Sequence, residues 1–285
     1  MESRKDDFQK YLQLKFDPKK ELDGIIHQTR NWFNENGGPD TKAVIGISGG
    51  KDSTIAAAIL VRALGEGRVI GVIMPDGQMS DLVDALDVAR LLNIAYTVVD
   101  ISEITKALTV ASQNACDGLN RDTAYQGFGH PKCAPVEMTG VNIPPRCRMA
   151  LLRAIASALP GGGRLINTCN ASEDYIGYST KDGDCAGDFS VLKDYTVTEL
   201  LLMADKGLPE LPHEFVHKTP SDGLCGKTDE DALTFTYEDL DRYLYGFACI
   251  NPEAPAKIRA RHKANLHKLS SMPYCHRSKP LDMTD

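Results

Sequence analysis

The sequence contains no apolar stretch long enough to cross a membrane, although it runs to 285 residues. A membrane-spanning helix needs about 20 consecutive apolar residues. Residues 1–7 carry five charged side chains and lack the apolar core that a secretory signal peptide requires. We therefore expect a cytoplasmic protein with no membrane partner.

Positive charge is scarce relative to negative charge. Lys and Arg number 32 and Asp and Glu 39, which gives a net charge of −7. Nucleic-acid-binding domains are usually basic, so no nucleic-acid partner is expected. The eight cysteines include no CxxC pair, which argues against a zinc site. In a chain without a signal peptide they are expected to be free thiols in a reducing compartment.

One stretch near the N-terminus combines features that bind phosphate. An apolar run over 43–47 leads into Ser48-Gly49-Gly50-Lys51-Asp52-Ser53, and a helix-forming run follows over 54–64. This pattern predicts a strand, a tight turn and a helix. The first amide groups of a helix lack partners and the helix dipole is positive there, so anions bind at this end. Gly49 and Gly50 let the backbone approach an anion closely.

Apolar strands and amphipathic helices alternate along most of the remaining chain. Further strands are predicted over 68–73, 95–99, 164–168 and 189–192. Such alternation indicates an α/β fold, a doubly wound parallel sheet with helices on both faces. Ligands of such sheets bind at the carboxyl ends of the strands, which puts 48–53, 74–78 and Asp100 on one rim.

Domain organisation follows from the same pattern. We expect a single domain over 1–285, with N-terminal helices in 1–40 and a nucleotide-binding core with C-terminal helices in 41–270. The polar, Gly- and Pro-rich stretches 115–140 and 209–231 are expected to be irregular.

The segment 48–53 differs from the GxxxxGK[ST] loop of P-loop NTPases, because the Lys precedes an Asp and the first glycine is missing. It instead resembles the pyrophosphate loop of the ATP pyrophosphatases. That resemblance implies that ATP is cleaved between its α- and β-phosphates. A carboxylate such as Asp52 beside phosphates suits Mg2+.

The second half of the sequence narrows the resemblance. Its motifs are similar in kind and order to those of NAD synthetases, and the similarity reaches from the phosphate loop to near residue 270. The motifs are 168–173, 177–184, 187–188, 218–224, 228–231 and 237–241. This resemblance implies an adenine nucleotide α-hydrolase-like fold. It also implies that the protein is a homodimer. It implies that deamido-NAD is adenylated by ATP with Mg2+, and that ammonia then displaces AMP to give NAD.

The resemblance also implies roles for individual residues. Asp52 and Glu173 are expected to hold Mg2+ and, with Lys181, to be the catalytic residues. ATP is expected to contact Gly46, Ile47, Ser48, Gly49, Gly50, Lys51, Asp52, Ser53, Thr168 and Ser221. The dinucleotide is expected to contact Arg146, Lys181, Asp188, His267 and Lys268.

Several points stay open at the level of sequence. Val197 stands where the family often has an ATP-contacting Lys, and Lys193 is a candidate substitute. His262-Lys263 is a rival to the pair His267-Lys268.

The alternative functions are another ATP-pyrophosphatase ligase and a non-catalytic nucleotide-binding protein of the same fold. No cysteine has the setting of a glutaminase nucleophile. We therefore expect free ammonia to be the nitrogen donor of the isolated protein.

Overall fold

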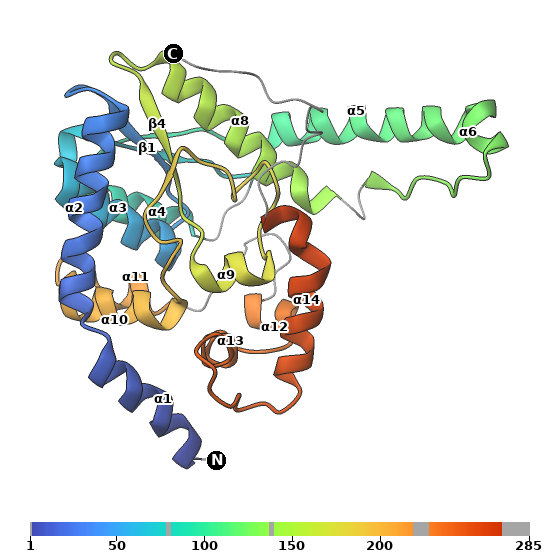
Figure 1. Cartoon of the computed structure of the whole chain (residues 1–285). Coiled ribbons are helices and arrows are strands. Elements are labelled where there is room, and N and C mark those ends of the chain that lie inside the picture. The colour runs from blue at the N-terminus through green and yellow to red at the C-terminus, as the bar shows by residue number, and fades with distance from the viewer. Residues whose placement is uncertain (1, 78–80, 137–139, 219–227, 270–285) are drawn as a thin grey trace, which may run out of the picture.

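The computed structural model describes residues 2–77, 81–136, 140–218 and 228–269. Its centre is a five-stranded sheet in the order β3-β2-β1-β4-β5, in which neighbouring strands are parallel (Figure 1). The strands are β1 (Lys42–Gly46), β2 (Val69–Ile73), β3 (Ala95–Val98), β4 (Gly163–Asn167) and β5 (Phe189–Ser190). The doubly wound parallel sheet predicted from the sequence is confirmed.

Helices cover both faces of the sheet, which explains why the buried residues 43–45 of β1 are all apolar. Ala43 and Ile45 belong to one hydrophobic core, and Val44 belongs to a second core on the opposite face. Successive side chains of a strand point to opposite faces, so both kinds of position must be apolar. The first core is built with α2 (Pro18–Asn36), α3 (Lys51–Leu64), α4 (Leu82–Leu91), α10 (Val197–Gly207) and α11 (His213–Val216), and the second with α8 (Ile143–Ala158).

A third apolar cluster lies beyond the carboxyl end of β4 (Figure 1). Ile176, Leu240 and Ile258 are fully buried in it. Its helices are α9 (Ala171–Ile176), α12 (Asp229–Leu233), α13 (Tyr237–Leu244) and α14 (Ala254–Leu269). This cluster brings the C-terminal part of the chain to the edge of the sheet at which ligands of parallel sheets bind.

Two stretches expected to be irregular contain helices. Residues 115–140 include the end of α5 (Ser102–Arg121), all of α6 (Thr123–Gly127) and the start of the 3-10 turn η2 (Gly140–Asn142). Residues 209–231 include α11 and the start of α12, while 219–227 lie outside the described residues. The Gly- and Pro-based prediction of long loops was wrong there, because turn-forming residues separate short helices as readily as they form loops.

The remaining elements are α1 (Glu2–Lys15) at the N-terminus and a 3-10 turn, η1 (Glu66–Arg68), before β2. Within the parts of the chain that the structure describes, each helix is too short or too polar to cross a membrane.

Candidate active site

The phosphate loop lies where the order of the strands reverses. β1 is the first strand and its neighbours are β2 and β4, so the connections leave it in opposite directions and open a crevice at its carboxyl end. β1 ends at Gly46 and α3 begins at Lys51. Lys51, Asp52 and Ser53 therefore form the first turn of the helix, three residues earlier than the sequence predicts.

Gly49 is required by the shape of this loop. Its φ is +78°, and a Cβ there would lie 2.7 Å from the Asp81 carbonyl oxygen. Hydroxyl groups fix the rest of the turn: the Ser48 and Ser53 hydroxyls lie 3.1 Å apart, and the Thr54 hydroxyl donates to the Gly50 carbonyl at 2.8 Å. The loop is thus held at the positive end of α3 before any ligand binds.

Lys51 does not extend toward solvent. Its side chain is only 6% exposed, donates to Asp52 Oδ2 at 2.7 Å and lies 5.2 Å from the centre of the Tyr237 ring. Burial disfavours the ammonium form, but the charges of Asp52 and Glu173 outweigh it and raise the pKa of Lys51. Lys51 is therefore a buried cation that balances acidic neighbours.

Glu173 is positioned by a helix cap. Asn170 and Glu173 form a capping box at the start of α9, in which the Asn170 side chain accepts from the Glu173 amide at 3.0 Å. The Asn170 amide group also donates to Asp52 Oδ1 at 3.4 Å. One residue thus connects the two carboxylates that the sequence analysis expects to hold Mg2+.

The environment of Glu173 disfavours its charged form. Burial and then the negative charge of Asp52 raise the pKa of Glu173 to about 8. Asp229 adds a further negative charge, and it accepts from the Tyr178 hydroxyl at 3.3 Å and the Tyr237 hydroxyl at 3.4 Å. Three acidic side chains beside a single ammonium group favour a bound cation.

Mg2+ fits the donors that are present. Among the described residues no three His, Cys, Asp or Glu side chains are grouped closely enough to hold a metal ion by themselves. Mg2+ is usually held by one or two carboxylates, with substrate phosphates and water as the other ligands. Asp52 and Glu173, beside a phosphate loop, suit that mode of binding.

Four of the five expected dinucleotide-binding residues come together on another side of the site. Arg146 donates to the Lys181 carbonyl at 3.3 Å, and the Lys181 ammonium donates to the His267 carbonyl at 3.1 Å. Lys268 donates to the carbonyls of Gly177 and Ser179 at 3.0 and 2.9 Å. These contacts join α8, the loop after α9 and the end of α14 into one basic surface.

The rival pair faces another part of the molecule. His262 stacks on the Tyr175 ring with the ring centres 4.3 Å apart, and its Nδ1 lies 2.6 Å from the Tyr175 carbonyl oxygen. Lys263 is exposed. The pair adjacent to Lys181 is therefore His267-Lys268.

Asp188 has partners of its own. It accepts from Arg153 at 2.5 Å and from the Leu165 amide at 2.8 Å, and its amide donates to the Leu165 carbonyl at 2.7 Å. These bonds tie the start of β5 to β4.

The other expected ATP contacts are placed as follows. Ile47 is buried and extends the pairing of β1 with β2, since its amide donates to the Val72 carbonyl at 3.0 Å. Thr168 follows β4 directly, and Ser221 lies outside the described residues. Val197 is buried at the start of α10, whereas Lys193 is exposed and lies 3.8 Å from the Asp174 carboxylate.

Asp241 holds α9 in place through buried hydrogen bonds. The sequence analysis includes it in a motif but assigns it no role. It is fully buried on α13 and accepts from the Ser172 hydroxyl at 2.5 Å and the Thr198 amide at 2.8 Å. Burial raises its pKa to about 6. Because Ser172 precedes Glu173, this contact fixes α9 and hence the Glu173 carboxylate.

Asp229 and Tyr237 were also not assigned roles from the sequence, because no local pattern places them beside Glu173. The Asn170 cap, in contrast, has a local signal, an Asn followed three residues later by Glu.

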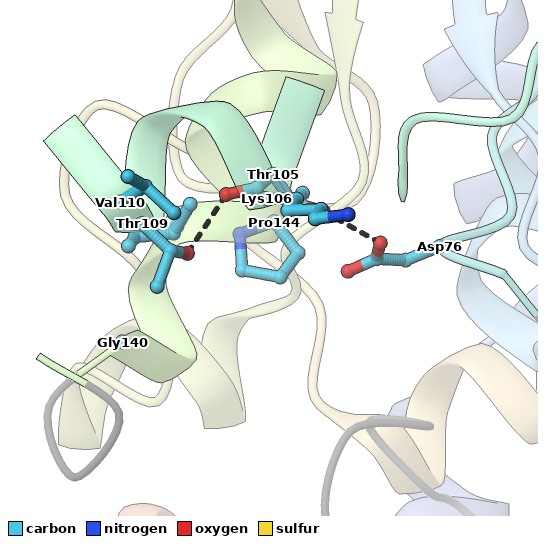
Figure 2. A pocket seen from close by; sticks show the side chains of 8 residues that line it. Asp76, Thr105, Lys106, Thr109, Val110, Gly140 and Pro144 are labelled. Atoms are coloured by element: carbon cyan, nitrogen blue, oxygen red, sulfur yellow. Dashed lines mark hydrogen bonds between the residues drawn. The ribbon is translucent and has the colours of Figure 1, made fainter. Parts of the chain in front are cut away.

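A cavity of about 370 Å³ opens at the same edge of the sheet (Figure 2). Asp76 follows β2 and accepts from the Thr105 hydroxyl of α5 at 2.7 Å, with Lys106 beside it. The far wall includes Ile143 and Pro144 of α8. The cavity therefore adjoins the helix turn that carries Arg146, and none of its lining residues belongs to the phosphate loop.

Together, the fold and this site define an α/β protein of the nucleotide-binding class, with a glycine-rich loop at a helix N-terminus, an acidic pair and a basic surface. The family model described as NAD synthase matches residues 24–272. The chain belongs to the NAD synthase family.

Curated relatives cover most of the chain. An NH3-dependent NAD(+) synthetase of Pyrococcus horikoshii is 35% identical over 227 residues, which are 79% of this chain and 78% of that protein. A protein of the same name from Methanococcus aeolicus is 36% identical over 209 residues, 70% of this chain and 72% of that protein.

Solved structures resemble the whole fold. The NMN synthetase of Francisella tularensis has a TM-score of 0.77 and 27% identity, covering 92% of this chain and all of that chain. The NH3-dependent NAD synthetase of Campylobacter jejuni, solved with a nitrate ion, has a TM-score of 0.66 and 25% identity over the same shares.

Proposed function

We propose that this chain is an ammonia-dependent NAD synthetase. It adenylates the nicotinate carboxylate of deamido-NAD with ATP, releases pyrophosphate, and then exchanges AMP for ammonia to give NAD. The observation that carries the proposal is the joining of Asp52 to Glu173 through Asn170 beside the loop 48–50 in a member of this family. The other ATP-pyrophosphatase ligases and a non-catalytic role are not favoured by these relatives.

The reaction needs no protein nucleophile, because the substrate carboxylate itself attacks the α-phosphate. Catalysis then consists of positioning and of charge stabilisation. The loop amides and the Ser48 and Ser53 hydroxyls bind the phosphates at the N-terminus of α3. Lys51, from its buried position, holds Asp52 in the orientation required there.

Mg2+ would be held by Asp52 and Glu173 and would neutralise charge on the departing pyrophosphate. Arg146, Lys181, His267 and Lys268 bind the dinucleotide, whose phosphates suit a guanidinium and ammonium groups. Asp188 supports that surface by fixing the segment between β4 and β5.

We further propose that the protein is a cytoplasmic homodimer. The support for the dimer is an apolar surface on β3 and α5, where Tyr96, Val98, Ile104 and Leu108 are each more than a third exposed. Large exposed apolar patches often mark protein–protein interfaces.

The direct test of the reaction uses the purified protein with ATP, Mg2+ and deamido-NAD. Addition of ammonium should yield NAD and AMP in equal amounts, and addition of ammonia-free glutamine should yield none. Absence of AMP under all these conditions would argue for the non-catalytic alternative. Equal rates with glutamine would overturn the assignment of the nitrogen donor.

A second substrate is favoured by one specific observation. The solved structure with a TM-score of 0.77 is that of an NMN synthetase, against 0.66 for the NAD synthetase of C. jejuni. Nicotinic acid mononucleotide carries the same reacting carboxylate as deamido-NAD and lacks the AMP half. The ratio of kcat/KM for the two acids decides between them, and we expect it to favour deamido-NAD because the dinucleotide makes additional contacts.

A further inference from the structure

The segment 102–136, which we call the arm, projects from the body of the molecule (Figure 1). It consists of α5, α6 and a return segment, 128–136, that runs back along α5. Two side chains of α5 hold the return segment. Asn120 Oδ1 accepts from the Cys133 amide at 2.8 Å, and Gln113 Oε1 accepts from the Val136 amide at 2.9 Å.

Cys116 lies between these two anchors on the same face of α5. It is three residues after Gln113 and four before Asn120, and residues so spaced are neighbours on one helix surface. That surface contacts the return segment, so Cys116 faces the segment that carries Cys133. Burial and then the adjacent Cys133 thiol raise the pKa of Cys116, which agrees with the two thiols lying against each other.

The tip of the arm is fixed as well. The Tyr125 hydroxyl donates to the Pro131 carbonyl at 2.9 Å and lies 3.9 Å from Cys133 Sγ. Cys133 is thus held by contacts from both α5 and α6. Two cysteines separated by 17 positions in the sequence are brought together by an ordered hairpin.

These thiols are accessible and have no role in the proposed reaction. Cys116 and Cys133 are both half-buried, whereas Cys147, Cys169 and Cys249 are buried. A buried structural thiol is usually inert, whereas reactive thiols are partly exposed.

We propose that Cys116 and Cys133 are a modification site, a dithiol that forms a reversible disulfide between α5 and the return segment. The oxidant is a low-molecular-weight disulfide of the glutathione class. One cysteine thiolate attacks it, forming a mixed disulfide and releasing one small thiol. The second cysteine thiolate then attacks the protein sulfur and releases the other small thiol. The protein loses two electrons and two protons, and the small disulfide gains them.

The bond would close a loop over 116–133 that contains all of α6. It would join the two sides of the hairpin covalently at the position where the Asn120 side chain already joins them. Cleavage of the backbone inside this loop would then leave the two pieces of the chain connected.

The test is peptide mapping of the native full-length protein after incubation with glutathione disulfide. Remaining thiols are alkylated, the protein is unfolded without reductant, and trypsin is added. We expect a linked pair of the peptides 107–121 and 133–146 to contain most of both cysteines, and to disappear after dithiothreitol. Brief digestion of the native oxidised protein at Arg121 or Lys132 should give fragments that separate only on reduction.

Two variants complete the design. Cys133→Ala should abolish the linked pair and leave glutathione attached to Cys116. Cys185→Ala removes another half-buried cysteine and should leave the linked pair unchanged. Stable glutathione adducts on both Cys116 and Cys133 without the linked pair would overturn the proposal, as would equal pairing of Cys116 with other cysteines. The readout does not depend on enzymatic activity.

Discussion

Lys51 is the residue on which the charge balance of the site depends. It is the cation next to Asp52, Glu173 and Asp229, and it is almost fully buried. Removing one partner of a buried ion pair leaves an uncompensated charge in a poorly solvated place, whereas an exposed ion pair contributes little.

Lys51→Met should therefore lower the free energy of unfolding by about 3 kcal/mol, measured by urea denaturation at neutral pH. Lys193→Met is the matched control, because Lys193 pairs with Asp174 while 67% exposed, and its effect should be below about 1 kcal/mol. Equal effects of the two substitutions would contradict the account.

Glu173 gives a pH dependence whose sign can be worked out. Its pKa is raised from 4.5 to about 8 in the folded protein, so between these values the unfolded chain loses a proton that the folded chain keeps. The stability that depends on the protonated Glu173 is fully present below pH 4.5 and is lost as the pH rises toward 8.

Glu173→Gln cannot titrate. Relative to the wild type without metal, the variant should gain stability between pH 5 and pH 8, on the order of 1 kcal/mol per pH unit. Urea denaturation of both proteins across this range, with a chelator present, measures the difference. A difference that does not change with pH would show that Glu173 has an ordinary pKa.

At the scale of elements, α9 is held by a contact with α13. The Ser172 hydroxyl donates to the buried Asp241 carboxylate at 2.5 Å and accepts from the Val197 amide at 3.1 Å. One hydroxyl thus joins α9, α10 and α13.

Ser172→Ala should destabilise the protein by about 1–3 kcal/mol, because it leaves buried polar groups without one partner. It should also slow adenylation, since Glu173 follows Ser172 in α9. Ser157→Ala is a suitable control, because Ser157 is exposed and its hydroxyl donates to the Arg153 carbonyl of its own helix. If the two variants have the same stability and rate, α9 does not depend on this contact.

How much the sequence could predict depends on the distance between the groups concerned. The phosphate loop, the parallel α/β class of the fold and the Asn170 cap have local signals in the sequence, because each depends on residues that lie close together in the chain. Asp241 and Ser172 are 69 positions apart, and only the folded chain brings them together. The helices of 115–140 were missed for a different reason, since Gly and Pro residues mark the ends of short helices as well as loops.

The basic surface illustrates the same limit. The motif resemblance predicts Arg146, Lys181 and Lys268 as substrate ligands, but not how they lie relative to one another. The structure supplies that arrangement through backbone carbonyls, which have no sequence signal.

At the scale of the whole molecule, the apolar surface of β3 and α5 predicts self-association. Light scattering with size-exclusion chromatography should give the mass of a dimer, and Ile104→Glu with Leu108→Glu should give a monomer. Val83→Glu is the control, because Val83 is exposed on α4, and it should leave the dimer intact. A monomeric wild type would remove the proposed homodimer.

The central claim is that the substrate carboxylate itself is adenylated, and an oxygen label tests this most directly. Deamido-NAD carrying 18O at both oxygens of its nicotinate carboxylate is converted with ATP, Mg2+ and ammonium, and the AMP is analysed by mass spectrometry. If the carboxylate attacks the α-phosphate, its bridging oxygen stays with phosphorus when ammonia attacks the carbonyl carbon. The account predicts one labelled oxygen in each AMP formed with NAD. Unlabelled AMP, formed while NAD accumulates, would contradict it.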